Sequence, residues 1–268
     1  MKTFSILSWN IQGNINYSGF TRLKNIARYL HTSPADIIAL QEACDTEQLI
    51  DQVPALKGYF SFFPKRSLSS HVGTNGFNQN SILSKYPIVD QKEIDFSNIP
   101  SKSPLEHCSR TDIQIKRHTL RVYNTHFEIF RTGPLTRLKQ LEVIAKDASN
   151  HNGPIIICGD LNTSIPQAGW KRFFVRLLHR VPKHELPEDP LIRDLAEKVS
   201  FYHAVIKWGF KEALHLHQTT WSPFKTKFWE PLNQKLDWLI TKNLRVIKAM
   251  QGPYVSDHRP TKITCKLN

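Results

Sequence analysis

The chain has 268 residues, of which 40% are hydrophobic and 22% charged, with a formal net charge of +13 and a sequence pI of about 9.6. This length and hydrophobic content allow one large globular domain with a substantial core, or two small domains. The sequence contains no apolar run long enough to cross a bilayer. Its cysteines are far apart and form no CxxC pair, which argues against a disulfide framework; they are Cys44, Cys108, Cys158 and Cys265.

The excess of basic side chains favours a polyanionic partner. Nucleic acid, an anionic lipid surface and a phosphorylated substrate all fit, and charge alone does not choose among them. The first residues lead directly into a strand-like stretch, without an apolar signal region or a small-residue cleavage site. Together with the scattered cysteines, this predicts a cytoplasmic protein without disulfides.

Strand and helix patterns alternate along the chain. Apolar residues at helical spacing predict helices over 20–31 and 134–149, with Pro134 suited to a first turn. A polar, helical pattern at about 169–209 predicts an insertion rather than a second domain, because strand patterns resume after it. We therefore expect one domain over 1–268. The expected strands cover 4–11, 36–41, 59–63, 81–84, 111–115, 120–123, 236–240, 245–250 and 261–267, with one more beginning at Ile155.

The strand that begins at Ile155 organises the remaining patterns. Its apolar, mostly β-branched run indicates a strand buried on both faces, and Gly159 allows a sharp turn as it leaves the core. Asp160 and Asn162 then offer oxygen ligands at the strand end, where hard divalent cations bind. Taken alone, this segment fits a strand followed by an Asx turn equally well.

Similar polar groups end or begin other predicted strands. Carboxylates with amide oxygens suit Mg²⁺ or Mn²⁺, and soft thiolate ligands are missing. Histidines beside such an ion could supply a general base and a phosphate contact, and an Asp could orient one imidazole. The complete set is Asn10, Glu42, His126, Asp160, Asn162, Asp237, Asp257 and His258.

These motifs, in their order along the chain, resemble those of the endonuclease/exonuclease/phosphatase superfamily. The resemblance extends from Trp9 to Pro260, and each motif by itself is weak. Their style is closest to the tyrosyl-DNA phosphodiesterase 2, deoxyribonuclease I and sphingomyelinase branches. Exonuclease III usually carries Asn at the position of His126. The matching segments are Trp9-Asn10-Ile11, Gln41-Glu42, Asn124-Thr125-His126, Gly159-Asp160-Leu161-Asn162, Leu236-Asp237-Trp238 and Ser256-Asp257-His258.

The resemblance implies an α/β fold: a two-sheet β-sandwich with helices on both outer faces, as in deoxyribonuclease I. It also implies metal-dependent phosphoester hydrolysis by in-line attack of water. By motif, Glu42 is the principal metal ligand, and the resemblance leaves open whether one ion or two are bound. The remaining metal-site residues are Asn10, Asp160, Asn162 and Asp257.

The resemblance also assigns catalytic roles. It makes His258 a general base or a phosphate contact oriented by Asp237, and it gives His126 a hydrogen bond to a phosphate oxygen. Asp160 is the alternative group that activates water, and Asn162 is counted with these catalytic residues.

Substrate contacts and substrate class follow less directly. The resemblance implies substrate contacts for Arg110 and Asn124. Trp221, Lys225 and Lys227 lie in an aromatic and basic loop that could stack bases and bind phosphates, or could instead be structural.

Charge and motif together favour a Mg²⁺-dependent phosphodiesterase acting on DNA or RNA as a monomer. The alternatives are a phosphatase or sphingomyelinase-like phospholipase, and a catalytically inactive nucleic-acid-binding relative.

Overall fold

The computed structural model describes most of the predicted domain but not all of it. The described residues are 3–12, 20–43, 49–51, 53–64, 67–68, 77–100, 107–128, 134–164, 200–214, 218–222 and 234–267. Most of the predicted insertion at 169–209 lies outside them, as does Cys44, whereas residues 200–207 are helical. The three described cysteines are buried and not disulfide-bonded.

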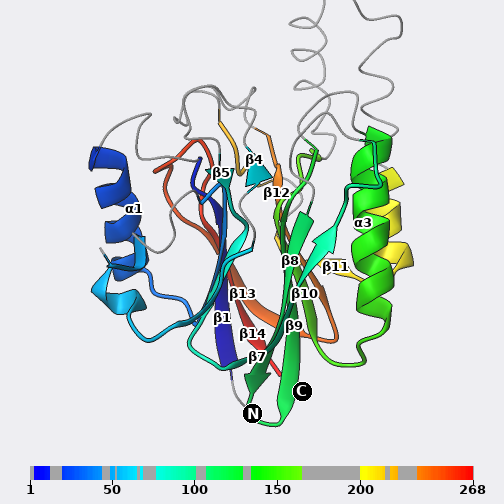
Figure 1. Cartoon of the computed structure of the whole chain (residues 1–268), viewed down its shortest axis with the longest axis horizontal. Helices are drawn as coiled ribbons and strands as arrows, with labels where there is room; N and C mark the ends of the chain where they lie inside the picture. Colours follow the sequence, from blue (N-terminus) through cyan, green and yellow to red (C-terminus); the bar gives the residue numbers. More distant parts are fainter. Residues whose placement is uncertain are drawn as a thin grey trace, which may run out of the picture.

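Two six-stranded sheets form the centre of the molecule (Figure 1). In the first sheet, β1 and β2 are parallel, and β1 is antiparallel to β14. The strand order is β13 (Arg245–Gln251), β14 (Thr261–Lys266), β1 (Thr3–Asn10), β2 (Ile37–Gln41), β6 (Ser81–Ser84) and β3 (Phe60–Phe62).

The second sheet also mixes parallel and antiparallel pairs. Here β9 and β10 are parallel, and β12 runs antiparallel to β10. The order is β11 (Lys211–Glu212), β12 (Asp237–Lys242), β10 (Ile155–Asp160), β9 (His118–His126), β8 (His107–Ile115) and β7 (Ile88–Asp95). A separate two-stranded sheet contains β4 (Ser67–Leu68) and β5 (Phe77–Asn78).

Helices cover the outer faces of both sheets, which gives the predicted helix–sheet–sheet–helix layering (Figure 1). Helix α1 (Phe20–Thr32) lies on the first sheet, whereas α3 (Pro134–Ser149) and the helix at 200–207 lie on the second. A short 3₁₀ helix, η1, spans Pro54–Leu56. Within the described part of the chain, no helix is long and apolar enough to cross a membrane.

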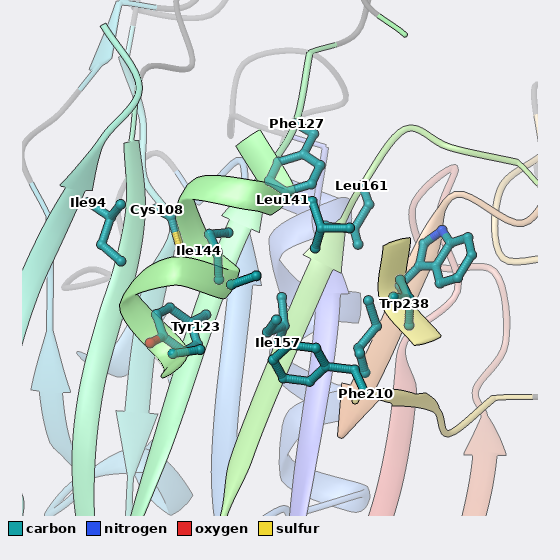
Figure 2. Close-up of a cluster of buried hydrophobic side chains, with 14 of the residues drawn as sticks. Ile94, Cys108, Tyr123, Phe127, Leu141, Ile144, Ile157, Leu161, Phe210 and Trp238 are labelled. Atoms are coloured by element: carbon teal, nitrogen blue, oxygen red, sulfur yellow. The ribbon is translucent and has the colours of Figure 1, made fainter. Parts of the chain in front are cut away.

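Alternation along the strands fills three apolar layers. Ile6 of β1 packs between the sheets with Val122 and Ile156, whereas its neighbour Leu7 packs outward with Leu30 of α1. The outer face of the second sheet buries a further cluster against α3 (Figure 2). Both faces of each sheet are therefore covered, as the continuous apolar runs predicted.

The sequence missed strand β7. Most of its residues are at least partly exposed, and it forms the free edge of its sheet. Its segment IVDQKEID carries neither an apolar run nor a clean alternation. Sequence patterns report burial, so an exposed edge strand leaves little signal.

Candidate active site

The polar groups meet at one edge of the sandwich because of strand direction. The parallel strands β1 and β2 end at Asn10 and Gln41, and β9 and β10 likewise end at His126 and Asp160. Antiparallel neighbours instead begin at this edge, so Asp237 at the start of β12 lies directly beside Asp160. The segment before β14 arrives in the same way and carries Asp257 and His258.

Asp160 is the centre of the cluster. Its Oδ2 accepts a hydrogen bond from Asn10 Nδ2 at 3.1 Å. The same oxygen lies 3.4 Å from His126 Nε2 and 3.4 Å from His258 Nε2. Its Oδ1 accepts the backbone N–H of Asn162 at 3.0 Å. One carboxylate from the second sheet thus contacts groups from both sheets.

Glu42 lies beside this centre. Its Oε1 accepts a hydrogen bond from Asn10 Nδ2 at 2.9 Å and lies 3.7 Å from His126 Nδ1. Glu42 and Asn162 both adopt left-handed backbone conformations, with φ of 52° and 48°. Non-glycine residues rarely do so, and such outliers gather at functional sites. The carboxylate is therefore presented by a specific, costly turn at the end of β2.

His258 and Asp237 form a buried pair. His258 Nδ1 lies 2.8 Å from Asp237 Oδ2, and both side chains are at most 5% exposed. Because a carboxylate can only accept a hydrogen bond, Nδ1 carries a proton and donates a hydrogen bond to Asp237. Nε2 therefore faces Asp160, at the centre of the cluster.

Burial and neighbouring charges shift these groups strongly. Burial alone would lower the pKa of His258, but Asp237 and Asp160 outweigh it, so the pKa lies well above its ordinary value. Burial raises the pKa of Asp237, which His258 and the Thr220 hydroxyl oppose. For Asp160, attraction by His258 and His126 overcomes burial and lowers the pKa. The Asp237–His258 pair thus holds a proton tightly beside an ionised Asp160.

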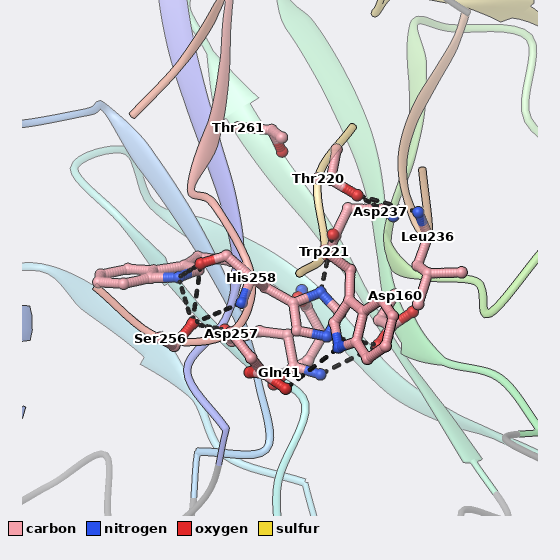
Figure 3. A network of polar contacts seen from close by, with 12 residues as sticks. Gln41, Asp160, Thr220, Trp221, Leu236, Asp237, Ser256, Asp257, His258 and Thr261 are labelled. Atoms are coloured by element: carbon pink, nitrogen blue, oxygen red, sulfur yellow. Dashed lines mark hydrogen bonds and ion pairs between the residues drawn. The ribbon is translucent and has the colours of Figure 1, made fainter. Parts of the chain in front are cut away.

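The segment carrying Asp257 closes the site. Ser256 Oγ donates to the backbone oxygen of Asn10 at 2.8 Å, which ties this segment to the end of β1. Asp257 Oδ2 accepts the indole N–H of half-buried Trp221 at 3.2 Å. Trp221 also pairs with His258 through an isolated antiparallel bridge, so the two residues lie side by side (Figure 3).

Comparison with known proteins places this geometry in a family. A model described as the Endonuclease/Exonuclease/phosphatase family matches residues 7–258. The chain belongs to this family. The family comprises hydrolases of phosphoester bonds, which generally use divalent metals.

Named relatives in the family are distant. Tyrosyl-DNA phosphodiesterase 2 of Homo sapiens is 24% identical over 164 residues, which cover 59% of this chain and 42% of that protein. The Xenopus tropicalis protein of the same name is 22% identical over 166 residues, covering 59% and 40%. The matched region is thus less than half the length of either relative.

Solved structures share the fold across the whole chain. A family member from Beutenbergia cavernae superposes with a TM-score of 0.74 at 12% identity, covering 100% of this chain and 72% of that one. Tyrosyl-DNA phosphodiesterase 2 of D. rerio, complexed with a single-strand DNA product, gives 0.67 at 16% identity, covering 99% and 100%. At these identities the likeness establishes the two-sheet fold.

The donor set fits the divalent metal that the family uses. Asn10, Glu42, Asp160 and Asp257 supply hard oxygen donors at one edge, as Mg²⁺ or Mn²⁺ prefers. Asp160, Asp237 and His258 also form a compact group, with ligand atoms within 4.8 Å of one another. We favour the oxygen-rich set, because Asp237 and His258 Nδ1 are already bonded to each other.

The structure separates two predicted substrate contacts from the rest. Arg110 forms ion pairs with Asp90 of β7 and with Asp147 of α3, the latter at 3.6 Å. Its strand partner Tyr123 belongs to the cluster against α3, so Arg110 lies on the face opposite His126. The predicted substrate contact of Arg110 is therefore corrected to a structural ion pair.

Asn124 shares the inward face with His126 but lies deeper. Its Nδ2 donates to the backbone oxygens of Leu40 and Ser81 at 2.9 Å, and its Oδ1 accepts Gln41 Nε2 at 2.6 Å. The side chain is fully buried and joins the two sheets. Asn124 is thus a structural bridge beneath the site rather than the predicted substrate contact.

Of the other predicted residues, one is at the site and two lie outside the part of the chain that the structure describes. Asn162 is at the site, where Nδ2 donates to the oxygen of Phe127 at 3.0 Å and leaves its amide oxygen as the only ligand atom. Lys225 and Lys227 lie outside the described residues. Sequence reasoning missed Thr220 and Lys235, which bond the backbone of Asp237. Thr220 left no local signal because it lies 17 residues before Asp237, and a lysine two residues before a strand is not in itself a sign of a buried backbone contact.

Proposed function

We propose that this chain is a divalent-metal-dependent phosphodiesterase that acts on nucleic acid. The observation that carries the proposal is Asp160 Oδ2, which lies within 3.4 Å of two imidazoles and accepts a hydrogen bond from Asn10. A bound Mg²⁺ or Mn²⁺ would polarise the phosphoryl oxygen and stabilise its developing charge. Glu42, Asn10, Asp257 and the Asp160–Asn162 turn would hold it.

The protein side chains have distinct tasks in this proposal. His258, oriented by Asp237, exchanges a proton through Nε2 with the attacking water or donates to a phosphate oxygen. Asp160 is the alternative base. Among the described residues, buried His126 Nδ1 has no hydrogen-bond partner and lies 3.7 Å from Glu42 Oε1, which suits a donor awaiting a phosphate oxygen.

The choice of substrate rests on charge and on relatives. A net charge of +13 attracts a polyanion. Half-buried Trp221 lies beside His258 and suits stacking on a base. The matched relatives are named as DNA phosphodiesterases. A monomeric state and a cytoplasmic location stay predictions.

Hydrolysis assays test the proposal. Wild type should hydrolyse bis(p-nitrophenyl) phosphate and a fluorescent oligonucleotide with Mg²⁺ and lose both activities in EDTA. Glu42→Gln should lose about 100-fold or more in kcat, whereas Glu142→Gln on α3 should stay at wild-type activity. Calorimetric titration with Mn²⁺ should show weaker binding to the Glu42 variant.

Other outcomes would move the assignment. Turnover of p-nitrophenyl phosphate or inositol phosphates with inert oligonucleotide would indicate a phosphatase, and turnover of sphingomyelin a phospholipase. Oligonucleotide binding without hydrolysis of any ester would indicate an inactive binding module.

A further inference from the structure

Thr220 connects the two halves of the Asp237–His258 pair. Its side chain is fully buried, and its Oγ1 accepts the backbone N–H groups of both Leu236 and Asp237 at 2.9 Å (Figure 3). Its own backbone oxygen accepts the N–H of Arg259 at 2.7 Å. One residue thus bonds the segment that carries the carboxylate and the segment that carries the imidazole.

The neighbours of Thr220 extend this bridge. Trp221 forms antiparallel bridges with Gln234 and with His258. Ser222 N–H donates to the backbone oxygen of Asp257 at 2.9 Å. Residues 220–222 therefore lie as a short strand between the start of β12 and the segment before β14.

The hydroxyl is the specific part of this bridge. Asp237 is the first residue of β12 and the last in register with β10, so the N–H groups of Leu236 and Asp237 lie at the edge of that ladder. The Thr220 hydroxyl oxygen accepts hydrogen bonds from the backbone N–H groups of both Leu236 and Asp237. Removing it would free the backbone beneath Asp237, and the 2.8 Å contact with His258 depends on where that backbone lies.

We propose that Thr220 is a positioning residue whose hydroxyl sets the geometry of the Asp237–His258 pair. This inference rests on the proposed function, in which that pair orients the imidazole toward the reacting phosphate. Thr220 itself touches neither substrate nor metal; it acts through Asp237. A shift of a few tenths of an ångström at Asp237 would misdirect His258 Nε2, which affects the chemical step rather than substrate binding.

Thr220→Val and Thr220→Ser form a matched pair, because valine keeps the shape and serine keeps the hydroxyl. We expect kcat of the diester reaction to fall about 10- to 100-fold in T220V with KM nearly unchanged, and T220S to restore most of it. Thr241→Val is the control. Thr241 lies on β12, the strand that Asp237 begins, and donates to the backbone oxygen of Lys211 at 3.3 Å, away from the Asp237–His258 pair.

A double-mutant cycle separates positioning from general damage. If Thr220 acts through Asp237, adding T220V to Asp237→Asn should cost nothing further in kcat, because coupled residues are not additive. Additive losses, or wild-type kcat in T220V, would overturn the inference. Should T220V fail to fold, Thr220→Cys takes its place, with a smaller loss expected because sulfur accepts weakly.

A second readout is independent of activity. The proton shared by His258 Nδ1 and Asp237 should give a downfield ¹H resonance that shifts or broadens in T220V but not in T220S or T241V. An inactive wild type with this response would reject the proposed function and keep the positioning role. An active wild type with an unchanged resonance in T220V would reject the positioning role.

Discussion

Asp237 shows how burial gives a single carboxylate its effect. It is 1% exposed, it contacts His258 at 2.8 Å, and its backbone is bonded on both sides, by Thr220 at N–H and by Lys235 at the carbonyl. A fixed charge in a dry environment interacts far more strongly than one in water. The side chain can therefore orient His258 and stabilise its protonated form without touching the substrate.

Asp237→Asn tests this role at the residue scale. The amide keeps the shape but removes the charge, so the imidazole loses both its orientation and the stabilisation of its charged form. We expect kcat for a phosphodiester to fall about 100-fold or more, with KM changed little. Asp95→Asn, at an exposed carboxylate that bonds Ser97, is the control and should keep wild-type kinetics. An unchanged kcat in D237N would remove Asp237 from the mechanism.

At the scale of elements, β10 shows why the strand end is built around glycine. Gly159 has φ of +135°, and a Cβ there would lie 1.9 Å from the backbone oxygen of Thr125 on β9. The parallel strands approach too closely for any side chain, and this approach brings Asp160 in register with His126.

Gly159→Ala should therefore destabilise strongly. We expect a loss of about 4 kcal/mol or more in the free energy of unfolding, because backbone must move as well as adopt strained dihedrals. Gly58→Ala separates these effects: Gly58 also has positive φ, at +91°, but nothing lies within 4 Å of its Cβ position. That variant should lose only about 1–2 kcal/mol. If urea denaturation gave equal losses in the free energy of unfolding for the two variants, backbone strain rather than the contact with β9 would account for the destabilisation.

Glu212 of β11 and Lys235, which lies two residues before β12, form a buried ion pair. Lys235 Nζ lies 3.1 Å from Glu212 Oε1 and donates to the backbone oxygen of Asp237 at 2.8 Å. The side chains of Lys235 and Glu212 are at most 3% exposed. The ammonium also lies 4.5 Å from the centre of the Trp238 ring. Buried pairs contribute little net stability, so the pair serves mainly to fix the chain beside Asp237.

The pH dependence of stability tests the burial of Glu212. Burial raises the pKa of its carboxyl above the ordinary value of 4.5, against the opposing effect of Lys235. The folded state therefore binds this proton more tightly than the unfolded state. The stability that protonated Glu212 contributes is fully present below pH 4.5 and is lost as the pH rises through the pKa of Glu212 in the folded state.

Glu212→Gln removes this titration. We expect the free energy of unfolding, measured in urea from pH 4 to pH 7, to fall less with rising pH in E212Q than in wild type. Other carboxylates contribute equally to both proteins and cancel in the difference. Parallel curves would contradict the raised pKa.

For the molecule as a whole, sequence and structure agree where a residue's role follows from its place on a strand. Asn10, Glu42 and Asp160 could be predicted because polar residues ending buried strands meet at one edge. Asn124 was predicted to contact substrate because it belongs to the same motif as His126, but a motif does not report depth between the sheets. Arg110 was misassigned because a cation beside a strand does not reveal which face it occupies.

Asn124 bears on how the two sheets are held together. It accepts from Gln41, the residue before Glu42, and donates to backbone oxygens of Leu40 and Ser81, while its own strand ends at His126. The contact between the sheets thus lies directly beneath the acids and imidazoles of the site. Most of the remaining interface is apolar and non-directional, so this bridge, together with the hydrogen bond from Asn10 to Asp160, fixes the register of one sheet on the other.

Asn124→Ala should therefore cost more than its size suggests. It leaves the Leu40 and Ser81 carbonyls buried without this donor, whereas Gln41 Nε2 keeps Ser8 Oγ and the Ala39 oxygen as acceptors. Each buried polar group that loses its partner costs about 1–3 kcal/mol, so we expect a loss of about 3 kcal/mol or more. Gln114→Ala is the matched control, because Gln114 also bonds Lys116, His118 and Thr119, but at the hairpin turn of the same sheet where water can replace it. That variant should lose less than about 1 kcal/mol. Urea denaturation of both variants decides: similar losses would mean that water reaches between the sheets and that packing alone sets their register.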